Sequence, residues 1–419
     1  MNEESVQRVR EEPPGPALWT NRNFLLLWSG QFVSQLGDRL YYIAFPWLVY
    51  GATDSALSTG VALALYTVPY LLFGMIAGVV IDRFDKRRLM LLAEVARLVL
   101  VLLVPVAASH ALWTVFALSF AVASLTVLFD PAKLSLLPDI VAKDQLLRAN
   151  SLLASAETLT EVLGYAAAGF LLAVVSTTTA FRIDAATFLF SAATLLLMSY
   201  RRPARAAGPA ARSFARELRE GFAQIRRHAG LLANTVLAVF IALGLGATLP
   251  LTFFLAVNVL GSQPRGAELD LGIASFGIFE AAIAAGYLSG SVAVAAVAAR
   301  LPLGRAIIAG FAMTGAGMAA IAAADRIWTA AVVFAVIGFA NAVGLIAIDT
   351  YVQRVVPEPV RGRVWGSRFM LTQGAYATSV LAGGALLTVM GAQTLFVAAG
   401  VIVALPALIA LFVPSLREA

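Results

Sequence analysis

Several acidic residues lie inside long apolar segments of the chain, where an ionised carboxylate is costly to bury, and four of them concern us first. Asp38 is in the first such segment, Glu157 and Glu161 are in the fifth, and Glu280 is in the eighth. Glu157 and Glu161 are four residues apart, which places them on one face of a helix. Because an apolar environment favours the neutral form of a carboxyl group, such residues can exchange protons near neutral pH. All four are therefore candidates for proton coupling.

Ion pairing within the protein is the alternative role for charges in apolar segments. Arg39 would neutralise either the preceding aspartate or one of the glutamates of the fifth segment. Glu94 and Arg97 are spaced to pair in the third segment, and Arg182 lies close to Asp184 in the sixth. For these last two combinations we favour a structural pair over a functional role.

Aromatic and polar side chains within the apolar segments are candidates to line a substrate cavity. Their number suits a large amphipathic ligand, held by apolar contact and a few polar groups. Core packing or lipid contact is the commoner role for any single aromatic residue. The candidates are Gln31, Gln35, Tyr42, Phe45, Tyr66, Tyr70, Phe253, Asn341, Gln373 and Tyr376.

These residues need membrane-spanning helices to position them. The chain has 419 residues, of which 60% are hydrophobic and 13% are charged, against about 25% charged residues in soluble domains. Apolar runs of the roughly 20 residues that a spanning helix needs recur along the sequence, without the alternation of a β-barrel. We expect an all-α membrane protein with twelve transmembrane helices near 24–50, 57–81, 88–108, 111–129, 150–175, 178–199, 230–260, 271–299, 303–323, 326–348, 364–390 and 393–413.

The basic residues predict how these helices are oriented. With both termini in the cytoplasm, only Arg265 and Arg326 of the 30 Lys and Arg residues fall in outer loops, and four more lie within helices. Cytoplasmic loops of membrane proteins are rich in Lys and Arg, so this bias favours a multi-pass protein of the inner (plasma) membrane with cytoplasmic termini. It also accounts for the net charge of +6, and we expect no nucleic-acid partner.

A repeat divides the chain into two related halves. DPAKLSLLPDIV (Asp130–Val141) and DTYVQRVVPEPV (Asp349–Val360) share an acid, a later proline and a second acid, at an offset of 219 residues. Transporters are often built from such repeats, with the substrate site between the halves near mid-membrane. We expect two pseudo-symmetric six-helix bundles, over residues 23–200 and 230–413, flanked by cytoplasmic tails at 1–22 and 414–419.

A cytoplasmic linker at 201–229 joins the two halves. Its second part, SFARELREGFAQIRRH, has Phe214, Leu218, Phe222 and Ile225 at helical spacing. We favour an amphipathic helix at the inner membrane surface, since the apolar side needs a partner. A solvated tether is the alternative.

The stretch GVVIDRFDKRR (Gly78–Arg88) resembles the signature of the loop between helices 2 and 3 in the major facilitator superfamily, where Gly and Asp-Arg precede a basic cluster. The twelve helices, the central linker and the repeat agree with that family. LWSGQFVSQLGDRL, FDPAKLSLLPDIV, AFRIDAATFLFSA and RGRVWG are similar to stretches of its macrolide-efflux and enterobactin-exporter group. Tyr165 stands where the family's antiporters carry proline, and Asp85 where the signature usually has glycine.

The resemblance implies that this charge cluster gates the transport cycle. We expect Asp82 to face the start of the eleventh helix, where exposed N–H groups favour an anion, and Arg83 or Arg87 to pair with Asp130. These contacts would hold the halves together in the outward-open state and release on inward opening. The candidate gating residues are Gly78, Asp82, Arg83, Arg87, Arg88, Asp130 and Asp349.

The resemblance also implies secondary active transport, and we predict a proton-coupled exporter of hydrophobic or amphipathic small molecules such as drugs, macrolides or siderophores. An importer or lipid flippase of the same fold is one alternative, and a membrane sensor that binds without transporting is another. The sequence has no Walker loop, nucleotide fingerprint, zinc spacing or nucleophile elbow, so we expect no enzyme activity and no cofactor. We expect a monomer whose partners are its substrate, protons and membrane lipid.

Overall fold

The computed structural model describes residues 18–108, 110–200, 214–260, 271–297 and 301–413. Within these ranges the chain forms helices and no strands, which confirms the predicted all-α class. Nine helical stretches of these ranges are long and apolar enough to cross a membrane. Three further long helices carry more polar and charged residues, so the count of twelve spans stays a prediction.

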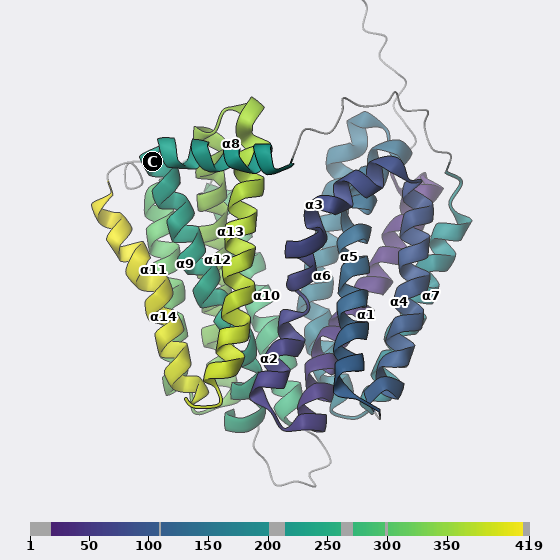
Figure 1. Ribbon diagram of the computed structural model, residues 1–419, viewed down its shortest axis with the longest axis horizontal. Helices are drawn as coiled ribbons and strands as arrows, with labels where there is room; N and C mark the ends of the chain where they lie inside the picture. Colours follow the sequence, from purple (N-terminus) through teal and green to yellow (C-terminus); the bar gives the residue numbers. More distant parts are fainter. Residues whose placement is uncertain (1–17, 109, 201–213, 261–270, 298–300, 414–419) are drawn as a thin grey trace, which may run out of the picture.

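The helices form two bundles that stand side by side (Figure 1). The N-terminal bundle contains α1 (Arg22–Thr53), α2 (Ala56–Ala64), α3 (Val68–Arg83), α4 (Lys86–Ala108), α5 (Leu112–Ile140), α6 (Leu146–Leu172) and α7 (Thr177–Leu197). The C-terminal bundle contains α9 (Ala229–Phe254), α10 (Leu271–Val297), α11 (Leu303–Ala320), α12 (Ile327–Val355), α13 (Glu358–Leu386) and α14 (Ala392–Ile409). Short 3₁₀ or π turns lie at Leu18–Thr20, Lys143–Gln145, Leu255–Leu260, Ile321–Ala323 and Ala410–Phe412.

The second predicted span is broken into two helices. We expected one helix over 57–81, but α2 ends at Ala64 and α3 begins at Val68. Pro69 follows directly, and a proline cannot donate the hydrogen bond that would continue a helix through this point. The break leaves Tyr66 between the two helices, inside the bundle.

α5 and α12 are longer than predicted, and the prediction was wrong in the same way for both helices. We placed their ends at residues 129 and 348, just before Asp130 and Asp349, whereas the helices continue to Ile140 and Val355. α5 continues through Pro131 and Pro138, because neighbouring helices can compensate for a proline within a bundle. Asp130 and Asp349 therefore lie within helices and not at their ends.

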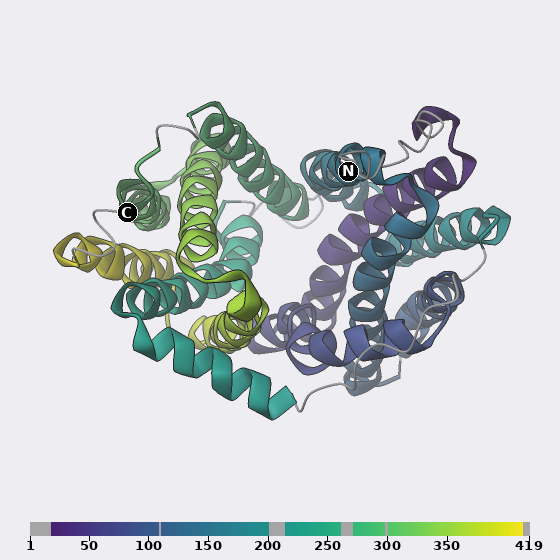
Figure 2. The ribbon, with the colours of Figure 1, turned by 90° about the horizontal axis from the view of Figure 1, so that it is seen from above.

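α8 (Phe214–Arg227) lies at one end of the molecule, along the C-terminal bundle, and we name this end the α8 end (Figures 1 and 2). It packs against the C-terminal bundle. Ser367 of α13 donates a hydrogen bond to the Leu218 carbonyl (3.2 Å), and Glu220 pairs with Arg363 (2.7 Å). Ile225 is buried. The first part of the predicted linker, 201–213, lies outside the described residues.

The two bundles meet at the end opposite the α8 end. There the backbones touch, because a Cβ built on Gly60 of α2 would lie 2.7 Å from Gly384 of α13, and one on Gly169 of α6 would lie 2.9 Å from Gly277 of α10. Small residues allow this close approach of helices in a membrane. We name these four glycines the glycine seal.

Aromatic rings surround the glycine seal. Tyr50 of α1 lies edge-on to Phe253 and Phe254 of the other bundle, and its hydroxyl donates to Asn258 (3.0 Å). Tyr42 stacks on Phe276 of α10. The contact between the bundles is therefore built of backbone, rings and one hydroxyl at this end.

Candidate functional site

A cavity of about 280 Å³ lies within the N-terminal bundle. Its walls come from α1, α3, α4, α5 and α6, and from Tyr66 at the break between α2 and α3. The structure brings together eight of the predicted site residues at this cavity, namely Gln31, Gln35, Asp38, Tyr42, Tyr66, Tyr70, Asp130 and Glu157.

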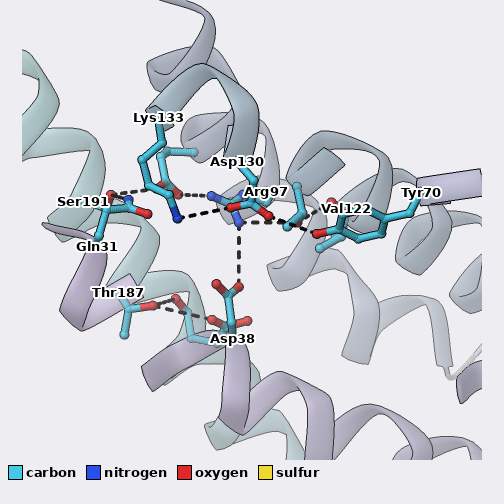
Figure 3. A network of polar contacts seen from close by, with 12 residues as sticks. Gln31, Asp38, Tyr70, Arg97, Val122, Asp130, Lys133, Thr187 and Ser191 are labelled. Atoms are coloured by element: carbon cyan, nitrogen blue, oxygen red, sulfur yellow. Dashed lines mark hydrogen bonds and ion pairs between the residues drawn. The ribbon is translucent and has the colours of Figure 1, made fainter. Parts of the chain in front are cut away.

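Arg97 of α4 is the centre of a charge network on the cavity wall (Figure 3). Its side chain is 2% exposed and pairs with Glu94 (2.9 Å) and more loosely with Asp38 of α1 (3.7 Å). The guanidinium also lies over the rings of Phe129 and Phe188, 4.8 and 4.5 Å from their centroids. The predicted Glu94–Arg97 pair is thus confirmed, and it extends to a candidate coupling residue.

Glu94 is held from both sides. It is fully buried, accepts a hydrogen bond from Ser191 of α7 (2.6 Å), and shares that hydroxyl with Gln31 of α1 (3.5 Å). A buried carboxylate requires such partners, because its desolvation is otherwise uncompensated. Glu94 therefore anchors Nη2 of the Arg97 guanidinium, while Nη1 pairs more loosely with Asp38 at the cavity.

Asp130 forms a second part of the network. It accepts a hydrogen bond from the Tyr70 hydroxyl (3.0 Å) and pairs with Lys133 one turn along α5 (3.4 Å). In this conformation Arg87 does not pair with Asp130, because its guanidinium donates to the carbonyls of Leu195 and Leu196 (both 2.6 Å). Arg87 thus caps the C-terminus of α7, where unpaired carbonyls favour a cation.

The rest of the predicted gating cluster is only partly described. The side chains of Asp82 and Arg83, and the surroundings of Gly78, lie outside the described part of the chain, and Arg88 is exposed. Asp85, which stands where the signature usually has glycine, accepts a hydrogen bond from the Arg88 N–H (2.9 Å). This is the geometry of a helix N-cap, so Asp85 starts α4.

Arg39 and Glu161 form an ion pair between α1 and α6 (3.1 Å). The same guanidinium donates to the Tyr165 hydroxyl (3.1 Å), so the tyrosine that replaces the family's proline orients the arginine. Of the two partners considered for Arg39, the structure selects a glutamate of the fifth predicted segment. Glu280 of α10, in the other bundle, lies close enough to interact electrostatically with both members of this pair.

A second cavity, of about 260 Å³, lies in the C-terminal bundle. Predicted residues Asp349, Gln373 and Tyr376 line it, together with Arg368 of α13. Arg368 is 4% exposed. Its guanidinium donates to the side-chain oxygens of Asn234 (2.5 Å) and Thr235 (2.9 Å), both from α9. This buried arginine is therefore held by neutral groups.

Three predicted substrate residues lie elsewhere in this conformation. Phe45 and Phe253 are fully buried in the apolar core, and neither lines the two cavities described above. Asn341 of α12 is partly buried, and its side-chain oxygen has no hydrogen-bond partner among the described residues. Their sequence signal, an aromatic or polar residue in an apolar segment, does not distinguish packing from binding.

The predicted Arg182–Asp184 pair is wrong. Arg182 is exposed and Asp184 is fully buried, since residues two apart on a helix point to different sides. Sequence reasoning also missed the roles of Lys133, Arg368 and Asn234. Lys133 had a usable signal, because it lies three residues after Asp130, whereas the Arg368 partners come from a different helix.

Among the described residues, no group of three or more His, Cys, Asp or Glu side chains could hold a metal ion. The arrangement suits proton exchange and ligand binding, because carboxyl, guanidinium and phenol groups share the wall of a cavity. Each group alone is costly within a bilayer, and the network reduces that cost by pairing.

Residues 27–290 match the family model of the Major Facilitator Superfamily, and the chain belongs to this family of membrane transporters. The chain is 26% identical over 409 residues to the multidrug efflux pump Tap of Mycolicibacterium fortuitum, which covers 94% of this chain and 96% of the relative. It is 25% identical over 411 residues to the uncharacterized MFS-type transporter YfiS of Bacillus subtilis, covering 96% of both. The macrolide efflux protein A of Streptococcus pyogenes is 24% identical over 234 residues, 54% of this chain and 58% of the relative.

Solved structures share the fold at low identity. The nucleoside transporter NupG has a TM-score of 0.79 at 12% identity, covering 93% of this chain and 99% of that chain. A POT family transporter in complex with 5-aminolevulinic acid has a TM-score of 0.76 at 12% identity, covering 95% and 97%. These likenesses confirm the predicted fold, an all-α protein of two helical bundles.

Proposed function

We propose that the protein is a proton-coupled secondary exporter of hydrophobic or amphipathic small molecules. The observation that carries the proposal is the Arg97 network, in which carboxylates of α1 and α4 surround a buried arginine on a cavity wall. Charges at this depth are costly unless they serve a cavity or a pathway. The printed functions of Tap and macrolide efflux protein A, both efflux, support export over import.

The arrangement of the bundles supports alternating access. The bundles touch through the glycine seal, and each contains a cavity. Tyr42 of one cavity and Tyr376 of the other pack on the same apolar cluster, so the cavities approach one another there. The positive-inside bias favours a cytoplasmic α8 end, which makes this conformation the inward-open one in our proposal.

The substrate would bind between the two cavities. Tyr42, Tyr66 and Tyr70 supply rings and hydroxyls from one side, and the Tyr376 phenol and the Gln373 amide lie on the other. Such surfaces suit a ligand with a large apolar body and few polar groups. In this proposal α8 contacts the lipid surface, and the protein acts as a monomer.

The proton would act at Asp38, Glu157, Glu161 and Glu280. Glu161 is the most informative of these, because its pair with Arg39 joins α1 to α6 and interacts electrostatically with Glu280 of the other bundle. Protonation of Glu161 would release Arg39 and change the charge at the boundary between the bundles. The Arg39–Glu161 pair is partly exposed, so its loss should cost at most about 1 kcal/mol of stability.

The test is transport by the full-length protein in proteoliposomes, with the dye ethidium and the macrolide erythromycin as probes and with an imposed pH gradient. Glu161→Gln keeps the shape of the side chain and removes its charge, so gradient-driven transport should fall to the level of protein-free vesicles. Asp144→Asn, an exposed acid of the Lys143–Gln145 turn, is the matched control. Unchanged coupling would remove Glu161 from the mechanism. If the natural protein bound a probe tightly without transporting it, the alternative of a membrane sensor would be favoured.

A further inference from the structure

Asp184 of α7 is a buried acid that the proposed mechanism does not yet use. It is fully buried, and its carboxyl group packs against Gly37 of α1, where a built Cβ would lie 2.5 Å from Asp184 Oδ1. Thr187 donates a long hydrogen bond to Oδ1 (3.5 Å), while its hydroxyl lies closer to the Asp184 backbone carbonyl (2.7 Å). Oδ2 has no hydrogen-bond partner among the described residues.

The cations around Asp184 are already engaged. Among the described residues, no Lys, Arg or His forms an ion pair with Asp184, and Arg97 pairs with Glu94 and Asp38. Three carboxyl groups from α1, α4 and α7 therefore share the field of one arginine. An ionised Asp184 would be a buried charge without a contacting counter-ion, the arrangement that proteins avoid most strongly.

The other groups that face Asp184 do not relieve this imbalance. Tyr41 of α1 and Tyr66 beside α3 lie within its electrostatic range, and both are neutral phenols. Asp130 of α5 interacts with Arg97 and adds a further acid to the cluster, and Lys133 pairs with that aspartate. The excess of acids over bases is thus a property of the whole cluster.

We propose that Asp184 is a proton-binding site, which holds a proton in this conformation and exchanges it with Asp38 at the cavity. Asp38 is suited to the exchange, because it adjoins Gly37, lines the cavity and is about one-third exposed. In the transfer the O–H bond of Asp184 breaks, an O–H bond forms on the Asp38 carboxylate, and Arg97 turns from Asp38 toward the new Asp184 carboxylate. The use of this proton in transport rests on the proposed function, whereas the proton site itself does not.

Infrared spectroscopy of the purified full-length protein in lipid nanodiscs tests the site without any substrate. The natural protein should show a carboxylic-acid C=O band at neutral pH that Asp184→Asn removes. Asp144→Asn, the same change at an exposed acid of the Lys143–Gln145 turn, should leave that band in place. The proposal is overturned if the band survives in Asp184→Asn or disappears in Asp144→Asn.

A second variant tests the placement of the acid without removing it. Gly37→Ala adds a methyl group against Asp184 Oδ1, so the band should change frequency, while Gly51→Ala on the same helix meets nothing within 4 Å and should leave it unchanged. A band that does not move in Gly37→Ala would contradict the assignment to Asp184.

Transport measurements distinguish the proposed proton site at Asp184 from the proposed export function. In proteoliposomes with ethidium and a pH gradient, Asp184→Asn should lose gradient-driven transport, and the exposed Asp144→Asn should keep it. Absence of transport by the natural protein would refute the proposed function and leave the infrared result to decide the proton site. Full gradient-driven transport by Asp184→Asn would refute the role of this proton in coupling.

Discussion

The two bundles bury one arginine each beside a cavity, but they surround it differently. Arg97 in the N-terminal bundle contacts two carboxylates, whereas Arg368 in the C-terminal bundle contacts an amide and a hydroxyl oxygen. Asp349 lines the C-terminal cavity, yet it forms no ion pair with Arg368 within 4 Å. The related bundles thus surround the first arginine with ionisable groups and the second with neutral polar groups.

This asymmetry suggests a division of labour within our proposed mechanism. A network with several acids and one arginine can change its protonation, because its members compete for a single positive charge. An arginine that contacts only neutral groups keeps the same partners at different pH values, so it places a constant positive charge at the cavity. The Arg97 network and Glu280 at the boundary between the bundles would then respond to protons, and the Arg368 cavity would present a constant surface to the substrate.

The largest expected effect comes from removing the two arginines. Arg97→Met leaves Glu94 buried without its cation and should reduce the free energy of unfolding by about 3–5 kcal/mol. Arg368→Met leaves only neutral groups unpaired and should cost about 1–3 kcal/mol. Thermal unfolding in detergent measures both. The double variant Glu94→Gln/Arg97→Met should recover part of the loss, and equal losses for the two arginines would remove the distinction between the bundles.

An intermediate effect is expected where the bundles are alike, at the glycine seal. Gly60→Val and Gly384→Val each add atoms to the same backbone contact, and each should disfavour this conformation by about 1–3 kcal/mol. The bundles should then close at the α8 end. The distance between the bundles at this end can be measured with spin labels attached at Asp144→Cys and Arg354→Cys. Because the chain has no other cysteine, only these two positions are labelled.

The matched control for this change is Gly51→Val, since Gly51 of α1 meets nothing within 4 Å. It should leave the distance between the labels unchanged. Different shifts for Gly60→Val and Gly384→Val would show that the two sides of the seal are not equivalent.

The smallest effect concerns the starts of α4 and α11, which occupy corresponding places in the two bundles. Asp85→Ala removes the N-cap of α4 and should reduce the free energy of unfolding by about 1 kcal/mol. Pro302 precedes α11 and makes no side-chain capping bond, so Pro302→Ala should cost much less. Thermal unfolding of both variants checks the difference, and a larger loss for Pro302→Ala would be inconsistent with it.

The sequence predicts those parts of the site that depend on one helix or on an unusual charge. Glu94 and Arg97 pair because they are three residues apart, and Arg39 finds a glutamate of α6 because few acids are available inside the bundle. The membrane class follows from apolar runs in the same way. These features depend on local spacing and on the cost of an unpaired charge.

Features that depend on packing between helices could not be predicted from the sequence. The extension of α5 through two prolines is permitted by neighbouring helices, and the partners of Arg368 come from α9. Asp184 had the same sequence signal as its neighbour Arg182, but only one of them faces the bundle interior. Helix rotation decides such cases, and a near-uniform apolar sequence contains little information about it.

The glycine seal also restricts how this protein can change over generations. Glycine has the smallest side chain, so every substitution at Gly60, Gly169, Gly277 or Gly384 adds atoms to a contact that has no space for them. Random mutation there can loosen the seal and cannot tighten it. The charge network, in contrast, can change in either direction, by gaining or losing a carboxylate.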